Sequence, residues 1–146
     1  MQYRLLGNSG LRVSEAALGT MTFGEEWGWG SPRHEACKVY DAFRNAGGNF
    51  IDTANFYTNG TSESFLGEFM KDHRQTVVLA TKYSNAAPGT DPNAAGNQRK
   101  NMMQAVEANL KRLHHRLHRP VLGSHLGPNY ASRRSHARTG WSAIRA

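Results

Sequence analysis

Short apolar runs alternate with amphipathic helical patterns along the first 113 residues, and this alternation constrains the fold more than any other feature. A helical pattern between two buried strands is the connection that parallel strands require. The alternation therefore predicts the α/β class with a parallel sheet. An open doubly wound sheet and a closed (β/α)8 barrel share this order over three units, so periodicity leaves both open. The strands are predicted at residues 16–20, 49–52 and 77–81, and the helices at 31–47, 62–71 and 101–113.

A β-hairpin is predicted ahead of the first of these strands, over residues 2–13. Tyr3 and Leu5 alternate with polar residues, and Leu11 and Val13 resume the alternation. Asn, Ser and Gly at positions 8–10 are typical of the turn between them. The hairpin precedes the α/β units and is not one of their strands.

Helix boundaries and faces follow from local signals. A hydroxyl N-cap at Ser31 followed by Pro32 predicts the start of the first helix, and Gly47 with Gly48 predicts its end. Residues at helical spacing predict the apolar faces. These are Ala36, Val39, Tyr40 and Phe43 in the first helix, Phe65, Leu66, Phe69 and Met70 in the second, and Met103, Val106, Leu110 and Leu113 in the third.

Composition predicts a single globular domain. No apolar run approaches the roughly 18 residues of a membrane span, and the N-terminus lacks the apolar core of a signal peptide. Cys37 is the single cysteine, which excludes an internal disulfide. These features predict a cytoplasmic protein without a membrane partner.

The net charge of +7 is unevenly distributed. Residues 1–113 hold 12 Lys and Arg against 11 Asp and Glu, whereas residues 114–146 hold 6 Arg and no acid. A basic tail of this kind can bind nucleic acid. Only Tyr130 and Trp141 supply aromatic groups there, so base stacking has little support and no nucleic-acid partner is expected.

Three ionisable residues fall at the predicted C-terminal strand ends, where α/β folds build their sites. Asp52 ends the second strand, Tyr57 lies in the loop after it, and Lys82 follows the third strand. Each has an ordinary structural explanation, as a cap, a packed loop residue or a solvated charge. Adjacent strands lie about 4.8 Å apart, so Asp52 and Lys82 can pair if their strands are neighbours. An ammonium beside a phenol stabilises the phenolate, which makes Tyr57 a candidate proton donor.

The residues around these three positions resemble the aldo-keto reductase family, and particularly its longer bacterial members related to potassium-channel β subunits. The resemblance runs from Gln2 to Leu113 without an obvious gap. It is carried by the sequences Asn-Phe-Ile-Asp-Thr-Ala at 49–54, Ala-Thr-Lys at 80–82 and Leu-Gly-Thr-Met-Thr-Phe at 18–23, and by Tyr57, Gly60, Ser62, Glu63, Leu66 and Gly67.

This resemblance implies a (β/α)8 barrel whose bottom is closed by the hairpin, and an NADPH-dependent reduction of an aldehyde or ketone. It implies that Tyr57 donates the proton, that Lys82 favours its release, and that Asp52 orients Lys82. Gly19, Thr20, Met21 and Asp52 are then expected beside the nicotinamide of NADPH. Trp27 and Trp29 fall in the first βα loop, where the family lines its substrate pocket; packing within the loop explains them equally well. A small carbonyl compound is the partner implied.

The resemblance stops after Leu113, where the family has a fourth strand that carries its catalytic histidine. Codons can be chosen for residues from His115 onward that, read one base later, encode Thr-Asp-Tyr-Ile-Asp-Leu-Tyr-Trp-Val-His, a strand of the expected kind. We therefore divide the chain into an N-terminal barrel part, residues 1–113, and a basic tail, 114–146, that a frameshift explains. His125 is not assigned as the catalytic histidine, and no metal site is predicted from the histidines of the tail.

A barrel of this type needs about 250 residues, so the chain alone is expected to show little or no turnover. A non-catalytic, channel-associated regulatory subunit of the same fold is the alternative function.

Overall fold

The computed structural model describes residues 1–85 and 91–115. Its first element is the predicted hairpin, made of β1 (Tyr3–Leu5) and β2 (Arg12–Ser14). The two strands are antiparallel, with Tyr3 opposite Ser14. At the turn the Leu6 amide donates to the Leu11 carbonyl, and Gly7 and Gly10 both adopt positive φ. The chain can therefore reverse within a few residues.

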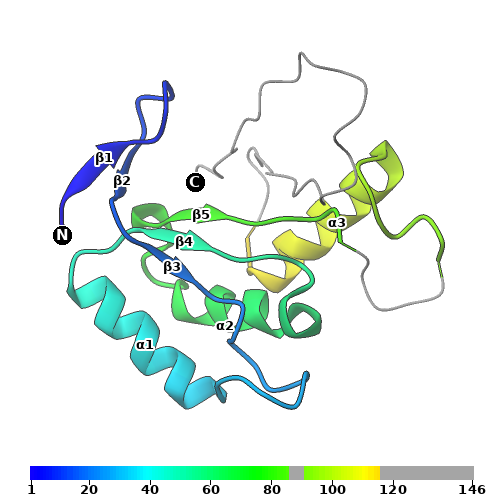
Figure 1. Cartoon of the computed structure of the whole chain (residues 1–146), viewed down its shortest axis with the longest axis horizontal. Helices are drawn as coiled ribbons and strands as arrows, with labels where there is room; N and C mark the ends of the chain where they lie inside the picture. Colours follow the sequence, from blue (N-terminus) through cyan, green and yellow to red (C-terminus); the bar gives the residue numbers. More distant parts are fainter. Residues whose placement is uncertain (86–90, 116–146) are drawn as a thin grey trace.

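A parallel sheet in the order β3-β4-β5 follows the hairpin (Figure 1). Its strands are β3 (Ala17–Gly19), β4 (Phe50–Asp52) and β5 (Val78–Ala80). The helices α1 (Arg33–Asn45) and α2 (Thr61–Phe69) connect them, and α3 (Arg99–Arg112) comes after β5. Two short 3-10 turns, η1 (Tyr57–Gly60) and η2 (Arg74–Thr76), flank α2. The predicted strand–helix alternation is confirmed.

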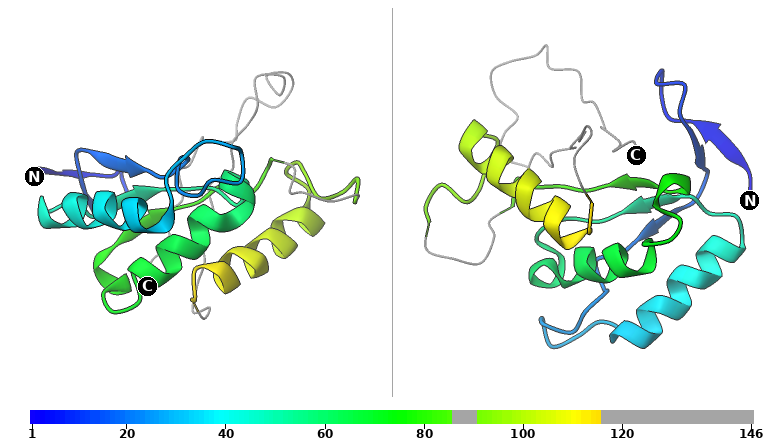
Figure 2. Two further views of the ribbon diagram at one scale, coloured as in Figure 1. Left: turned by 90° about the horizontal axis from the view of Figure 1, so that it is seen from below. Right: turned by 180° about the vertical axis from the view of Figure 1, so that it is seen from behind.

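The helices pack in chain order, with α1 beside α2 and α2 beside α3 (Figures 1 and 2). The core lies between the sheet and α1 and α2. Ile51 and Leu79, at the middle of β4 and β5, are fully buried and are packed by Tyr40 from α1 and Leu66 from α2. A sheet whose strands alternate with helices in this way places its C-terminal strand ends at one common rim.

The hairpin lies at the opposite, N-terminal ends of the strands. The Tyr3 hydroxyl donates to the Gly47 carbonyl at 2.6 Å, and the Ser14 amide donates to the Asn49 side chain at 2.7 Å. Gly47 has a φ of 84°, the left-handed conformation predicted at the end of α1. The hairpin thus covers the bottom of the sheet and leaves the rim clear.

Three local predictions were wrong. Ser31 does not cap α1 through its side chain; the N-cap is Pro32, because the backbone of Ser31 is held by the Thr22 carbonyl and the Gly24 amide of the preceding loop. Val39 and Met103 were assigned to apolar faces, but their exposures are 46% and 43%. Successive helical residues are about 100° apart, so a side chain next to a buried one can still point outward.

Among the described residues, no helix is long and apolar enough to cross a membrane. The tail predicted over 114–146 lies outside the described residues except for His114 and His115, as does His125.

Candidate active site at the C-terminal rim of the sheet

The structure brings the three predicted catalytic side chains together at the C-terminal rim. Asp52 is the last residue of β4 and is in register with Ala80, the last residue of β5. Lys82 follows β5 by two residues, and Tyr57 opens η1 just after β4. Because β4 and β5 are direct neighbours, the loops that leave their ends start side by side.

Lys82 is the centre of this cluster. Its Nζ lies 2.8 and 2.6 Å from the two carboxylate oxygens of Asp52, and 3.1 Å from the hydroxyl of Tyr57. It also donates to the Thr53 carbonyl at 3.0 Å. The side chains of Lys82 and Asp52 are only 19% and 25% exposed, so solvent screens the pair incompletely. The ammonium is fixed by the carboxylate and aimed at the phenol.

The backbone around Tyr57 explains how a phenol is brought over Lys82. The Tyr57 amide donates to the Ala54 carbonyl, and the next two residues, Thr58 and Asn59, have φ of 47° and 57°. Two consecutive left-handed residues are unusual outside glycine and turn the chain sharply. Thr58 is fully buried and its hydroxyl donates to the Phe23 carbonyl. The turn is thereby anchored to the loop after β3.

The residues predicted to face a cofactor differ in accessibility. A Cβ added at Gly19 would meet no atom within 4 Å, and Met21 is 44% exposed. Thr20, between them, has no exposed surface; its hydroxyl donates to the backbone carbonyl of Asp52 at 3.1 Å. Gly19 and Met21 are free to contact a ligand, whereas the side chain of Thr20 holds Asp52.

A buried hydroxyl cluster supports the rim, and no signal in the sequence predicted it. The Ser62 hydroxyl lies 2.8 Å from the Thr20 carbonyl, 2.9 Å from the Thr20 hydroxyl and 3.1 Å from the Thr53 hydroxyl. These contacts tie α2 to the ends of β3 and β4, on either side of Asp52. Ser62 is part of the family motif, but a serine near a helix start is more commonly explained as a cap.

A second buried cluster joins α2, α3 and the end of β5. The Glu63 carboxylate is fully buried, accepts from the Thr81 hydroxyl at 2.6 Å and pairs with the Arg112 Nε at 2.7 Å. Burial raises the pKa of Glu63, and the Arg112 charge and the Thr81 hydroxyl oppose this. Thr81 directly precedes Lys82, so this cluster fixes the segment that carries the ammonium. Nothing in the spacing of Glu63 and Arg112 predicts their pairing.

Aromatic residues of the loop after β3 pack on Phe56, the residue before Tyr57. The Trp27 ring lies 5.5 Å from the Trp29 ring and 5.3 Å from the ring of Phe56, which directly precedes Tyr57. Trp29 is 51% exposed. An apolar, partly exposed surface therefore adjoins the site. Over residues 1–85 and 91–115, no group of three His, Cys, Asp or Glu side chains is arranged to hold a metal ion.

Comparison with known sequences gives the same assignment as the motifs. The Aldo/keto reductase family matches residues 16–117. The chain is 43% identical over 125 residues to norsolorinic acid reductase B of Dothistroma septosporum, a match that covers 77% of this chain and 32% of that protein. It is 51% identical over 87 residues to the aryl-alcohol dehydrogenase [NADP(+)] of Phanerodontia chrysosporium, which covers 56% of this chain and 23% of that protein. The chain thus spans about a third or less of the length of these curated relatives.

Solved structures confirm the fold. The holo form of an aldo-keto reductase from Bacillus halodurans superposes with a TM-score of 0.68 at 33% identity, over 79% of this chain and 37% of that protein. The neighbours are (β/α)8 barrels, and the strands and helices described above are a part of such a barrel. The choice between an open sheet and a closed barrel, which periodicity left open, is thereby settled in favour of the barrel.

Proposed function

Because the chain belongs to the aldo/keto reductase family, we propose that its rim is the proton-donating part of a site that reduces an aldehyde or ketone with NADPH. One observation carries the proposal: Lys82 Nζ contacts both the Asp52 carboxylate and, at 3.1 Å, the Tyr57 hydroxyl. A lysine paired only for stability has no need of a phenol as a further partner.

In the proposed reaction the substrate carbonyl oxygen lies within hydrogen-bond distance of the Tyr57 hydroxyl. A bound nicotinamide cofactor would supply the hydride that the carbonyl carbon accepts. Tyr57 gives its proton to the oxygen, so that the carbonyl becomes an alcohol and a phenolate remains. The Lys82 ammonium stabilises that phenolate, and Asp52 keeps the ammonium in place.

The residues on the cofactor side fit a flat ring. Gly19 presents no side chain, Met21 is exposed, and both lie at the end of β3 next to β4, which Asp52 ends. We propose that Gly19, Met21 and Asp52 lie beside the nicotinamide, with Thr20 behind them. The choice of NADPH is supported by the NADP(+) in the name of a relative that is 51% identical over 87 residues.

The aromatic surface supports an aromatic substrate. The ring centroids of Trp27 and Phe56 lie 5.3 Å apart, and Phe56 directly precedes Tyr57 in the sequence. Aromatic rings stack favourably on such surfaces. The name of the same relative, an aryl-alcohol dehydrogenase, agrees with this preference. We therefore propose an aromatic aldehyde as the first substrate to test.

The site of the chain alone is proposed to be incomplete. Asp52, Tyr57 and Lys82 provide three of the family's four catalytic positions, and the predicted basic tail stands where the family has the strand that carries the fourth. We expect little or no reduction of an aldehyde by the 146-residue chain. A chimera that joins residues 1–113 to the remainder of the Phanerodontia relative supplies the other positions and permits a positive test.

The test is NADPH oxidation by this chimera with an aromatic aldehyde. Turnover is expected, and Tyr57→Phe should lower kcat by about 10²- to 10⁴-fold because a positioned acid contributes that much. Tyr83→Phe is the matched control, since it removes the hydroxyl of a tyrosine next to Lys82 and should leave kcat within about twofold. Equal activity of the Tyr57→Phe and parent chimeras would refute the proposal. A folded chimera that binds NADPH without turnover would favour the regulatory alternative.

A further inference from the structure

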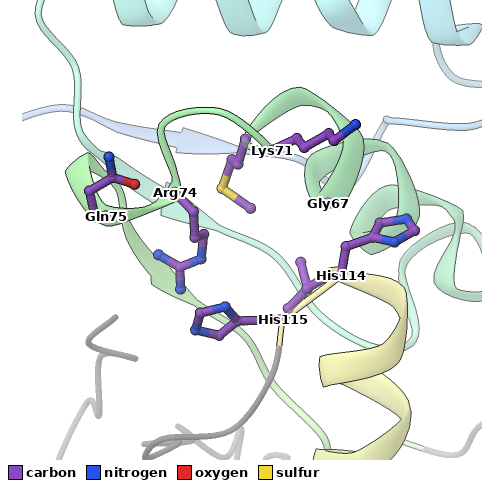
Figure 3. Close-up of a pocket in the computed structure, with 8 residues that line it drawn as sticks. Gly67, Lys71, Arg74, Gln75, His114 and His115 are labelled. Atoms are coloured by element: carbon purple, nitrogen blue, oxygen red, sulfur yellow. The ribbon is translucent and has the colours of Figure 1, made fainter.

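A second group of charged side chains lies at the other end of β5, away from the rim. Eight of the described residues, five between Gly67 and Gln75 and three just after α3, line a cavity of about 220 Å³ (Figure 3). Four of them are basic: Lys71, Arg74, His114 and His115. None is acidic. Figure 3 shows the Arg74 guanidinium and the His115 ring on one side of the pocket, with Lys71 and His114 on the other.

Close packing of α2 against the end of α3 forms this pocket. A Cβ on Gly67 would lie 2.5 Å from the Arg112 carbonyl oxygen, so only glycine allows the two helices to approach this closely. Buried Met70 and Leu113 form an apolar floor. After Leu113 the chain turns at His114, whose φ is 53°, and this turn brings His115 to the pocket.

Arg74 is the least satisfied of the basic groups. Its Nη1 donates to the Val77 carbonyl at 2.8 Å, but its Nε is buried and has no hydrogen-bond partner among the described residues. No carboxylate is paired with it in the described part of the chain. A buried donor without a partner is destabilising. The last acid of the sequence is Glu107, so the residues that follow supply no Asp or Glu.

Helix capping does not explain the basic groups. Cations near helix C-termini can bind the last carbonyls. Here backbone amides already satisfy these carbonyls: Leu113 donates to Asn109, His115 to Leu110, and Met70 to Leu66. Each helix end still contributes roughly half a negative charge, which is less than the two full charges of Lys71 and Arg74 together.

We propose that this pocket binds an oxyanion of the phosphate class, either inorganic phosphate or a phosphate monoester. The Arg74 guanidinium lines the pocket, and its Nη groups, unlike the buried Nε, are the donors offered to phosphate oxygens. His115 lies on the same side of the pocket as Arg74. Lys71 adds a positive charge on the opposite side of the pocket. The apolar floor of Met70 and Leu113 suits the organic part of an ester.

The proposal is tested by calorimetric titration of the full chain with inorganic phosphate and with phenyl phosphate, at an ionic strength held constant with sodium chloride. Constant ionic strength removes general screening from the signal. We expect one site with a dissociation constant on the order of 1 mM. Tighter binding of phenyl phosphate would assign the site to esters, and equal affinities would assign it to the free ion.

Variants locate the binding. Arg74→Gln should weaken phosphate binding at least tenfold, and Lys71→Gln should weaken it about threefold. Lys38→Gln, which changes an exposed side chain on α1, should change the affinity less than twofold. His115→Asp places a carboxylate in the pocket and should abolish binding. If Arg74→Gln does not fold, Lys71→Gln and His115→Asp carry the test. Absence of binding to the folded chain, or equal affinities of the parent, Lys71→Gln and His115→Asp chains, would overturn the proposal.

Discussion

Two cations lie at opposite ends of β5, and their surroundings differ. Lys82, at the C-terminal rim, has both oxygens of Asp52 within 2.8 Å and a phenol at 3.1 Å. Arg74, at the N-terminal end, has one backbone carbonyl and a buried Nε without a partner among the described residues. A cation that is paired with an acid is held in position for chemistry. A cation without an acid keeps a positive charge that can attract an anion from solution. Four substitutions sharpen or break this contrast.

Lys82→Met should have the largest effect on activity. It leaves the partly buried Asp52 carboxylate without its counter-ion and removes the group that stabilises the phenolate. In the chimera we expect kcat to fall at least 10²-fold. In the chain itself we expect a loss of about 1–3 kcal/mol in the free energy of unfolding, measured with urea at pH 7. Unchanged kcat in a folded Lys82→Met chimera would break the assignment of the rim.

Glu63→Gln should destabilise the chain by about 1–3 kcal/mol at pH 7, because the single oxygen of the Gln amide cannot accept from both Thr81 and Arg112 as the two carboxylate oxygens do. The pH dependence gives a second readout. Burial raises the pKa of Glu63 in the folded state above its usual value of 4.5, so its contribution to stability is greatest below pH 4.5 and falls as pH rises through the folded pKa. Glu63→Gln should remove this part of the pH dependence in urea unfolding between pH 4 and 8. Identical pH profiles for the parent and the variant would contradict a contribution of Glu63 to the pH dependence of stability.

Ser62→Ala should cost about 1–2 kcal/mol, because it removes the hydroxyl that contacts both Thr20 and Thr53 and leaves their groups less satisfied. Ser64→Ala is the matched control on the same helix, since the Ser64 hydroxyl bonds only the Gly60 carbonyl. Thermal unfolding of both variants measures the difference. A loss that is no larger for Ser62→Ala than for Ser64→Ala would show that the hydroxyl cluster does not support the rim.

Arg74→Met should have the smallest effect on stability, within about 1 kcal/mol of zero. It replaces a half-buried cation that lacks an acid with an apolar side chain of similar length, an exchange that is often neutral or stabilising. Its comparison with Lys82→Met uses the same replacement at both ends of β5. Equal losses in the free energy of unfolding for Arg74→Met and Lys82→Met, measured with urea, would show that the two cations are equivalent.

The sequence predicted the order of strands and helices because each apolar run is short and each helical face is periodic. The sequence also predicted that Asp52 and Lys82 can pair, because Asp52 ends β4 and Lys82 follows β5, and these two strands are neighbours. The contacts of Glu63 with Arg112 could not be predicted, because they join residues on different helices whose relative placement depends on the packing at Gly67. The predictions for Val39 and Met103 were wrong because periodicity assigns an apolar face to a helix without showing which part of that face is covered. The cofactor, the role of each rim residue and the origin of the tail stay predictions.

The measurement that tests the account most directly is a double-mutant cycle between Asp52 and Lys82. The free energy of unfolding is measured for the parent chain, Asp52→Asn, Lys82→Met and the double variant. Groups in direct contact are coupled by about 0.5–3 kcal/mol, and the bidentate, partly buried geometry predicts at least about 1 kcal/mol in favour of the pair. A coupling energy of zero would contradict the convergence of Asp52, Lys82 and Tyr57 on which the proposed chemistry rests.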